Sequence, residues 1–301
     1  MSKQQLDGIL KMAAQNPPPP NATPDVMRRW SEGITSHTQL AENVEIKRVK
    51  VGSFEGDLIL PEGGDPSRLI IYYHGGGFFF FPAAPIASRP PTWRAPPGVP
   101  CSRPIIVSRP KILPPAAHDD AFAVYQSILK QGYAPAKIAL SGDSAGGNLA
   151  LATAVRAREA GLPLPGSLML LSPWLDFAEE GASYRNTTDD PILPPQVLDG
   201  FKLTYLGNGD RKSSNVTPFD ADLRGLPPTL VHVGSWERLL DDSVGIVERM
   251  KAAGVAAELK IFDGMCHGWQ LFAPMLDEGM ASIEDSAAFI TLNQGVTAAV
   301  A

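Results

Sequence analysis

One short segment near the middle of the chain limits the possible folds more than any other. Residues 142–146 read Gly-Asp-Ser-Ala-Gly, between an apolar strand-like run and a helical pattern that extends from Ser144 to Ala160. A serine placed there lies on a sharp turn, and small flanking residues tolerate the strained backbone that such a turn requires. The beginning of the helix adds a positive field that stabilises developing negative charge. The segment therefore predicts that Ser144 is a nucleophile; the alternative is a glycine-rich turn whose serine has no role.

Strand-like and helix-like segments alternate along most of the chain. Paired alternating runs at 44–49 and 58–60 predict antiparallel strands, and continuous apolar runs predict strands buried on both faces. The continuous runs lie at 69–73, 137–141, 168–171 and 229–233. A further strand is expected at 257–262, and helices are expected at 144–160 and 239–253. This order predicts an α/β fold, with helices on both faces of a mostly parallel sheet. With 301 residues, the chain is long enough for one such domain.

Two regions fall outside this alternation. Residues 3–15 and 25–40 predict helices separated by a run of prolines, and the stretch 183–213 combines prolines with an apolar helical pattern. We expect these regions to pack together as a small helical cap. The expected organisation is an N-terminal cap segment at residues 1–40 and a catalytic domain at 41–301 that carries a cap insertion at about 183–213.

A glycine-rich loop, His74-Gly75-Gly76-Gly77, directly follows the apolar run at 69–73. Glycines allow backbone N–H groups to approach a ligand closely, and acyl transfer needs such donors around the oxygen that becomes negatively charged. The expected donors of this oxyanion hole are the N–H groups of Gly76, Gly77 and Ala145. A merely flexible loop is the alternative, but its place after a strand and upstream of Ser144 argues against it.

The base that activates the serine is sought among five histidines. In this chain order the acid and then the histidine follow the serine, so only His232 and His267 qualify. His232 lies inside an apolar strand-like run and is expected to be structural. His267 lies in the expected loop after the run at 257–262, and we predict that it is the base.

The acid is expected after the preceding run, 229–233, and Glu237 is the first carboxylate there. Its role would be to hold the imidazole in one tautomer and to stabilise the imidazolium. Asp241 and Asp242 come one turn later, within a helix, and we expect them to be its solvated or first-turn charges. Cys266, beside His267, is expected to be a packing residue because no activating partner is evident.

Together these segments resemble the bacterial hormone-sensitive-lipase family of esterases. The shared marks are residues 74–77, 142–147, 172–176 and the His267 loop, and the resemblance covers most of residues 40–275. It implies an eight-stranded α/β-hydrolase core, an N-terminal helical cap, activity on short to medium acyl esters, no cofactor and no metal, and a homodimer. Many members have aspartate where this chain has Glu237, and either carboxylate can fill the role.

The resulting prediction is a serine carboxylesterase acting on small-molecule esters through an acyl-enzyme. One alternative is amidase or deacetylase chemistry with the same three residues. Another is a non-enzymatic ligand receptor, although receptors on this fold generally lack a triad residue, and all three candidates are present here. Five residues are candidates for an acyl pocket and equally for the core: Phe78, Phe79, Tyr205, Leu206 and Trp269.

Composition excludes several other classes. The net charge of −6 and the absence of a basic cluster argue against nucleic-acid binding. The apolar runs are too short to span a bilayer, and the N-terminal residues lack the pattern of a secretory signal. Two cysteines, Cys101 and Cys266, give no disulfide framework, so we expect a cytoplasmic protein.

Residues 80–115 depart from the family pattern. They hold 11 of the 29 prolines, and Pro104-Ile105-Ile106-Val107 stands where the family has a central strand. Prolines remove ladder hydrogen bonds from a central strand. Our hypothesis is a compensated frameshift in the recorded sequence, because a shifted frame with suitable codons allows the family motif over residues 104–113. If the printed residues are real, we expect a badly damaged sheet and weak or no activity.

Overall fold

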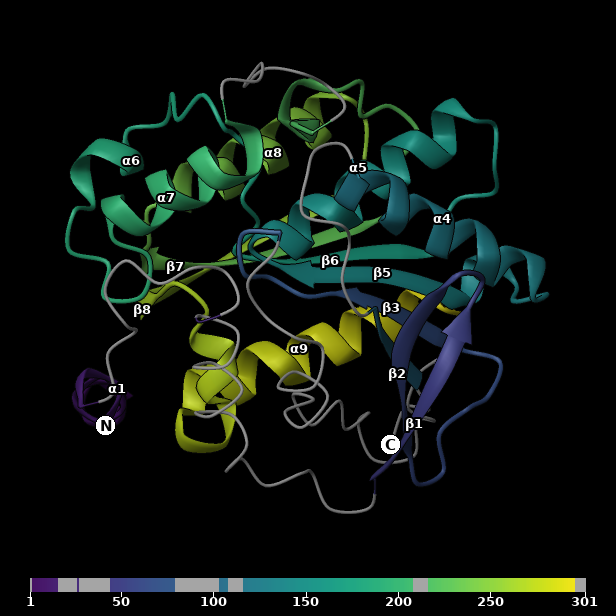
Figure 1. Ribbon diagram of the computed structural model, residues 1–301, viewed down its shortest axis with the longest axis horizontal. Coiled ribbons are helices and arrows are strands. Elements are labelled where there is room, and N and C mark those ends of the chain that lie inside the picture. The colour runs from purple at the N-terminus through teal and green to yellow at the C-terminus, as the bar shows by residue number, and fades with distance from the viewer. Residues whose placement is uncertain are drawn as a thin grey trace.

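The computed structural model describes residues 2–15, 26, 44–78, 103–107, 116–207 and 216–295, and its centre is a mixed eight-stranded sheet (Figure 1). The strand order is β1-β2-β4-β3-β5-β6-β7-β8. Strand β2 runs antiparallel to both of its neighbours, and the strands from β4 to β8 pair in parallel, which confirms the expected α/β-hydrolase arrangement. The strands are β1 Val44–Val51, β2 Phe54–Pro61, β3 Leu69–Tyr73, β4 Arg103–Val107, β5 Ile138–Asp143, β6 Ser167–Leu171, β7 Thr229–Trp236 and β8 Ala257–Cys266.

The burial of each strand explains its sequence pattern. Every residue of β3 and of β6 is buried, because helices cover both faces of the centre of the sheet. This burial requires the continuous apolar runs seen in the sequence. Strand β1 lies at one edge, and most of its residues are partly or fully exposed, which accounts for its mixture of charged and β-branched side chains.

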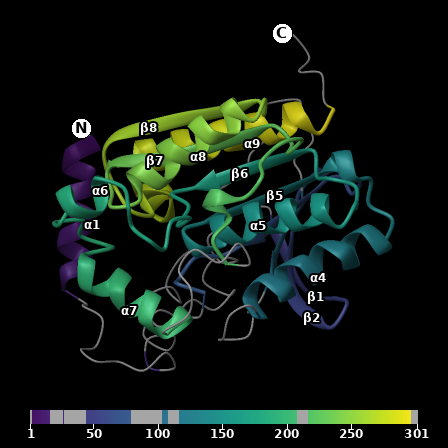
Figure 2. The ribbon, with the colours of Figure 1, turned by 90° about the horizontal axis from the view of Figure 1, so that it is seen from above.

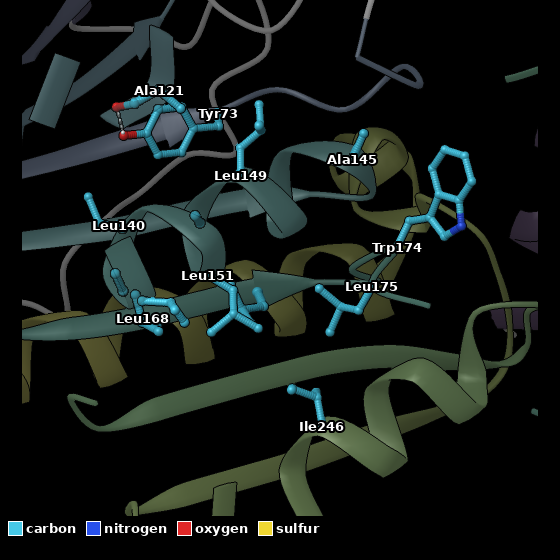
Figure 3. Close-up of a cluster of buried hydrophobic side chains, with 14 of the residues drawn as sticks. Tyr73, Ala121, Leu140, Ala145, Leu149, Leu151, Leu168, Trp174, Leu175 and Ile246 are labelled. Atoms are coloured by element: carbon cyan, nitrogen blue, oxygen red, sulfur yellow. Dashed lines mark hydrogen bonds between the residues drawn. The ribbon is translucent and has the colours of Figure 1, made fainter. Parts of the chain in front are cut away.

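Helices cover the two faces of the sheet unequally. Helices α4, α5 and α8 lie on one face, and α9 lies on the other (Figures 1 and 2). Figure 3 shows Leu140 and Leu168 of the sheet and Leu151 of α5 within one cluster of buried hydrophobic side chains. The helices are α1 Ser2–Ala14, α4 Ala116–Lys130, α5 Ala145–Glu159, α6 Ser183–Asn186, α7 Pro195–Leu206, α8 Leu240–Ala252 and α9 Asp277–Asn293, with 3-10 turns η1 Pro135–Lys137, η2 Pro218–Asp220 and η3 Trp269–Met275.

Described segments of the expected cap lie at one end of the molecule. Figures 1 and 2 place α6 and α7 at the same end as α1. Leu6 and Ile9 of α1 are buried against Trp269 of η3, so the N-terminal helix packs beside the segment that follows His267. The helix expected at 25–40 lies outside the described residues except for Val26, and the division into cap and catalytic domain stays a prediction. None of the described helices has the length and apolar character needed to cross a bilayer.

The strand β4 corrects our expectation of a damaged sheet. Arg103–Val107 lies between β2 and β3 and pairs with both. Pro104 is accommodated because it stands near the beginning of the strand, where the pairing with β2 has not yet started: the first pair on that side joins Leu58 to Ile105. Residues 79–102 and 108–115 lie outside the described residues, so the frameshift hypothesis stays untested.

Candidate active site

The turn between β5 and α5 consists of Ser144 alone. Its backbone has φ 54° and ψ −122°, a conformation that costs a non-glycine residue energy and recurs at functional sites. The turn depends on close contacts that only glycine allows. A Cβ on Gly146 would overlap the carbonyl of Tyr73, and one on Gly142 would overlap the backbone of Gly146. The small residues of the motif are therefore required by geometry, as the sequence predicted.

The glycine-rich loop after β3 has a left-handed backbone at three consecutive residues. Gly76, Gly77 and Phe78 have consecutive positive φ values of 94°, 60° and 73°. The N–H of Ala145 lies in the first turn of α5, where a helix offers no internal acceptor. The positive end of the helix acts at the same place. A role for the N–H groups of Gly76, Gly77 and Ala145 in an oxyanion hole is a proposal that these features support.

A buried hydrogen bond joins the predicted base to the predicted acid. His267 Nδ1 lies 2.8 Å from Glu237 Oε2, and the Glu237 side chain is completely buried. Because the carboxylate accepts, Nδ1 carries the proton and Nε2 is the basic nitrogen. Burial alone would lower the pKa of His267, but the hydrogen bond and charge of Glu237 outweigh it and raise that pKa above its ordinary value.

Both residues lie closer to the sheet than we expected. Strand β7 continues to Trp236 and β8 to Cys266, so Glu237 and His267 each directly follow a strand rather than standing inside a loop. Trp236 pairs with Cys266 across an irregularity in the ladder. This extension fixes the two side chains relative to each other through paired backbone.

The second oxygen of Glu237 is held from two sides. Glu237 Oε1 accepts hydrogen bonds from Ser172 Oγ at 2.7 Å and from the Gly234 N–H at 2.6 Å. Ser172 directly follows β6 and has φ 43°, so a strained backbone presents its hydroxyl to the acid. In the sequence, Ser172 stands out only as part of the family segment 172–176. Its one local signal is a short polar side chain directly after a buried strand.

The nucleophile is linked to this pair through backbone contacts. The Ser144 N–H donates to the Leu171 carbonyl at 2.9 Å, and the Trp174 N–H donates to the Ser144 carbonyl at 3.0 Å. Ser172, which holds Glu237, lies between these two partners. Within the described part of the chain, no hydrogen bond joins the Ser144 side chain to His267, so proton transfer between them is a proposal; such bonds are often long without substrate.

Asp241 and Asp242 lie in the first turn of α8, as expected, but they differ in their contact with solvent. Asp242 is not solvated: it is buried and accepts hydrogen bonds from the Leu175 and Asp176 N–H groups and from Tyr184 Oη at 2.7–2.8 Å. Burial raises the pKa of Asp242 to about 8. The residue thus anchors the segment after β6 onto α8. Asp241 accepts from the Ser183 N–H at 2.9 Å.

The described candidates for an acyl pocket are all buried, and their role in a pocket stays a prediction. Phe78 and Tyr205 are 2% and 1% exposed and stack with ring centroids 4.1 Å apart, and Trp269 is completely buried. Leu206 is also buried, and Phe79 lies outside the described residues. The half-buried Phe201 instead borders the glycine loop: a Cβ on Gly77 would lie 2.6 Å from its Cγ. Phe201 belongs to the apolar pattern of the stretch 183–213, but that pattern does not show that its ring meets the loop.

The sequence and the family resemblance predict a packing role for Cys266 and no metal site. Cys266 is buried, and burial raises the pKa of its thiol to about 12, which agrees with a packing role. Among the described residues, no group of three or more histidine, cysteine or carboxylate side chains is arranged to hold a metal ion.

Comparison with known proteins places the chain among esterases. The sequence matches the alpha/beta hydrolase fold family over residues 106–271, a range that contains Ser144, Glu237 and His267. It is 38% identical over 182 residues to an acetyl-hydrolase of Streptomyces hygroscopicus, covering 60% of this chain and 61% of that protein. It is 40% identical over 179 residues to an esterase of Acinetobacter venetianus, covering 59% of each chain. The chain thus spans about three fifths of the length of these curated relatives.

The structural likeness extends further along the chain. An esterase described as a member of the bacterial hormone-sensitive lipase family superposes with a TM-score of 0.88 and 34% identity, covering 97% of this chain and 99% of that one. Because this match spans nearly both chains at well above 25% identity, it carries more than a shared fold.

Proposed function

Because this chain belongs to the alpha/beta hydrolase fold family, and within it to the bacterial hormone-sensitive-lipase esterases, we propose that it is a serine carboxylesterase. Ser144 attacks the carbonyl carbon of the ester while His267 Nε2 takes the hydroxyl proton. The resulting imidazolium gives this proton to the leaving alcohol, and water then hydrolyses the acyl-enzyme by the same route in reverse order.

Glu237 acts through His267. Its carboxylate keeps the proton on Nδ1, so that Nε2 faces the reaction as a base, and its charge stabilises the imidazolium. The Gly76, Gly77 and Ala145 N–H groups stabilise the negative oxygen of the tetrahedral intermediate. The proposal rests above all on one observation: the buried Glu237–His267 hydrogen bond stands at the ends of strands beside a serine held at positive φ.

We further propose that the acyl group is short to medium in length. Support comes from the ring of Phe201, which packs directly on Gly77 and limits the space beside the oxyanion loop. The name of one similar protein, an acetyl-hydrolase, agrees with a small acyl group. A cytoplasmic location and a homodimer stay predictions from the sequence and the family resemblance.

The test is hydrolysis of p-nitrophenyl esters of graded acyl length, with p-nitroacetanilide as the amide counterpart. We expect turnover of the acetate to hexanoate esters, little turnover of the amide, and a loss of about 10⁴–10⁶ in kcat for Ser144→Ala. The matched control is Ser141→Ala, which removes a second buried serine, located in strand β5 three positions before Ser144. Near-wild-type turnover by Ser144→Ala overturns the proposal, and preferential turnover of the anilide selects the amidase alternative.

A further inference from the structure

The motif around Ser144 contains an aspartate that the proposed mechanism does not use. Asp143 is the last residue of β5, one position before the nucleophile. Its Oδ1 atom accepts a hydrogen bond from Tyr72 Oη at 2.7 Å and a second from the Gly75 N–H at 2.9 Å. One carboxylate therefore connects the nucleophile turn, the end of β3 and the first residue of the oxyanion loop.

The contact with the loop is too close for any residue but glycine. A Cβ on Gly75 would overlap Asp143 Oδ2 and would come within 3.0 Å of Asp143 Cγ. The carboxylate thus occupies the space of the missing side chain. The next two residues, Gly76 and Gly77, have left-handed backbones, so the direction of their N–H groups depends on where Gly75 is fixed.

Tyr72 holds the carboxylate from the other side. It is buried in the part of the core beneath α9, whereas its neighbour Tyr73 belongs to the cluster on the opposite face of the sheet. Burial first, and then the charge and hydrogen bond of Asp143, raise the pKa of Tyr72, so its hydroxyl stays protonated and donates. Asp143 is in this way placed by the rigid centre of the sheet rather than by the loop.

We propose that Asp143 is a positioning residue that fixes the oxyanion loop against the nucleophile turn, a role that rests on the proposed esterase function. Its carboxylate sets the N–H groups of Gly76 and Gly77 at the distance from Ser144 that the tetrahedral oxygen requires. The positioned N–H groups stabilise the negative charge that develops in the transition state. Asp143 therefore raises kcat and does not change ground-state binding of the substrate.

The test compares Asp143→Ala, which loses both hydrogen bonds, with Asp143→Asn, whose amide oxygen can still accept both. Because loss of one oxyanion donor costs about 10²–10³ in kcat, we expect displacement of the loop in Asp143→Ala to lower kcat about 10- to 100-fold at nearly constant KM. Asp143→Asn should stay within about threefold of wild type, since it keeps the geometry. Asp263→Asn, an exposed carboxylate change on β8, is the matched control.

A transition-state analogue separates positioning from general damage. The affinity of an aryl trifluoromethyl ketone, whose adduct places an oxyanion in the loop, should fall in Asp143→Ala by the same factor as kcat/KM. A kcat within about threefold of wild type in folded Asp143→Ala overturns the proposal. So does a loss of kcat in Asp143→Asn that is as large as the loss in Asp143→Ala.

Folding is controlled with a double variant. Asp143→Ala leaves the buried Tyr72 hydroxyl without its partner, whereas Asp143→Ala combined with Tyr72→Phe removes both polar groups. If Asp143→Ala does not fold, the double variant is measured in its place. The same loss of kcat is expected of it, and a kcat within about threefold of wild type overturns the proposal. Failure of the esterase proposal has a different signature, since the wild type would then be inactive or Ser144→Ala active.

Discussion

Neighbouring strands of this protein carry two histidines that each bond to a carboxylate, and the two networks differ in one respect. His267, after β8, uses Nδ1 to bond Glu237, and its Nε2 has no hydrogen bond to another described residue. His232, inside β7, uses both nitrogens: Nδ1 lies 2.8 Å from Ser282 Oγ and Nε2 lies 2.9 Å from Asp285 Oδ2. The second network attaches α9 to the sheet.

The difference shows that serine, histidine and carboxylate side chains in contact do not by themselves make a catalytic site. His232 and Ser282 are completely buried, so no substrate reaches them. Burial also lowers the pKa of His232 despite Asp285, whereas Glu237 raises that of His267 despite burial. One histidine is adapted to accept a proton, and the other stays neutral as a structural link.

Replacing each histidine should give the largest contrast. We expect His267→Ala to lower kcat about 10⁴–10⁶-fold with little change in Tm, because the base is lost. His232→Gln should leave kcat within a few fold and lower Tm by several degrees, because a buried network worth about 1–3 kcal/mol is broken. Ester hydrolysis and thermal unfolding of the two variants check this; a loss of kcat in folded His232→Gln as large as in His267→Ala would remove the distinction.

Replacing the two carboxylates, Glu237 and Asp285, should give the next largest difference in kcat. Glu237→Gln offers an amide N–H to His267 and favours the wrong tautomer, so we expect kcat to fall about 10³–10⁴-fold. Asp285→Asn should leave kcat unchanged and cost about 1 kcal/mol or less, since Asp285 is partly exposed. Chemical denaturation measures the free energy of unfolding of both. Comparable kcat values for the two variants would contradict the assignment of Glu237.

The serines that support each network provide a finer test. Ser172→Ala removes one of three hydrogen bonds to Glu237, and we expect kcat to fall about three- to tenfold at constant KM. Ser282→Ala removes a bond to His232 and should affect Tm alone. An unchanged kcat in Ser172→Ala would mean that Gly234 holds the acid unaided.

The His267 and His232 networks should also differ in their pH dependence. His267 must be neutral to act, and its pKa is raised, so kcat/KM should fall as pH decreases, with a midpoint above the ordinary value of about 6.5. The pKa values of His232 and Asp285 are lower in the folded state than in the unfolded chain. As pH decreases, the unfolded chain therefore binds protons before the folded protein does, and this network loses stability only below about pH 6.5. We therefore expect activity to decline before Tm; a Tm that falls together with kcat/KM would contradict this.

Local signals in the sequence predicted much of the fold and site. The apolar runs identified the buried strands, and the glycines around Ser144 identified a turn whose close contacts only glycine permits. Chain order left His232 and His267 as candidates, and the apolar run around His232 distinguished it from His267; the structure places His232 in the core.

What the sequence missed depends on tertiary contacts. Ser172 and Asp242 owe their roles to neighbours more than 60 positions away, and no local pattern encodes such distances. Strand β4 forms, contrary to our expectation, because Pro104 lies before the first residue of the strand that pairs with β2. Sequencing the gene still decides the frameshift hypothesis: a single-frame read of residues 80–115 as printed would refute it.

The most direct test of the central claim is to identify the serine that carries the acyl-enzyme chemistry. The enzyme would be inactivated with diethyl p-nitrophenyl phosphate, which phosphorylates an activated serine, and then digested for peptide mass spectrometry. We predict one label per chain on Ser144, in proportion to the activity lost, and no label in Ser144→Ala. Full inactivation with the label on another residue, such as Ser172, would contradict the account.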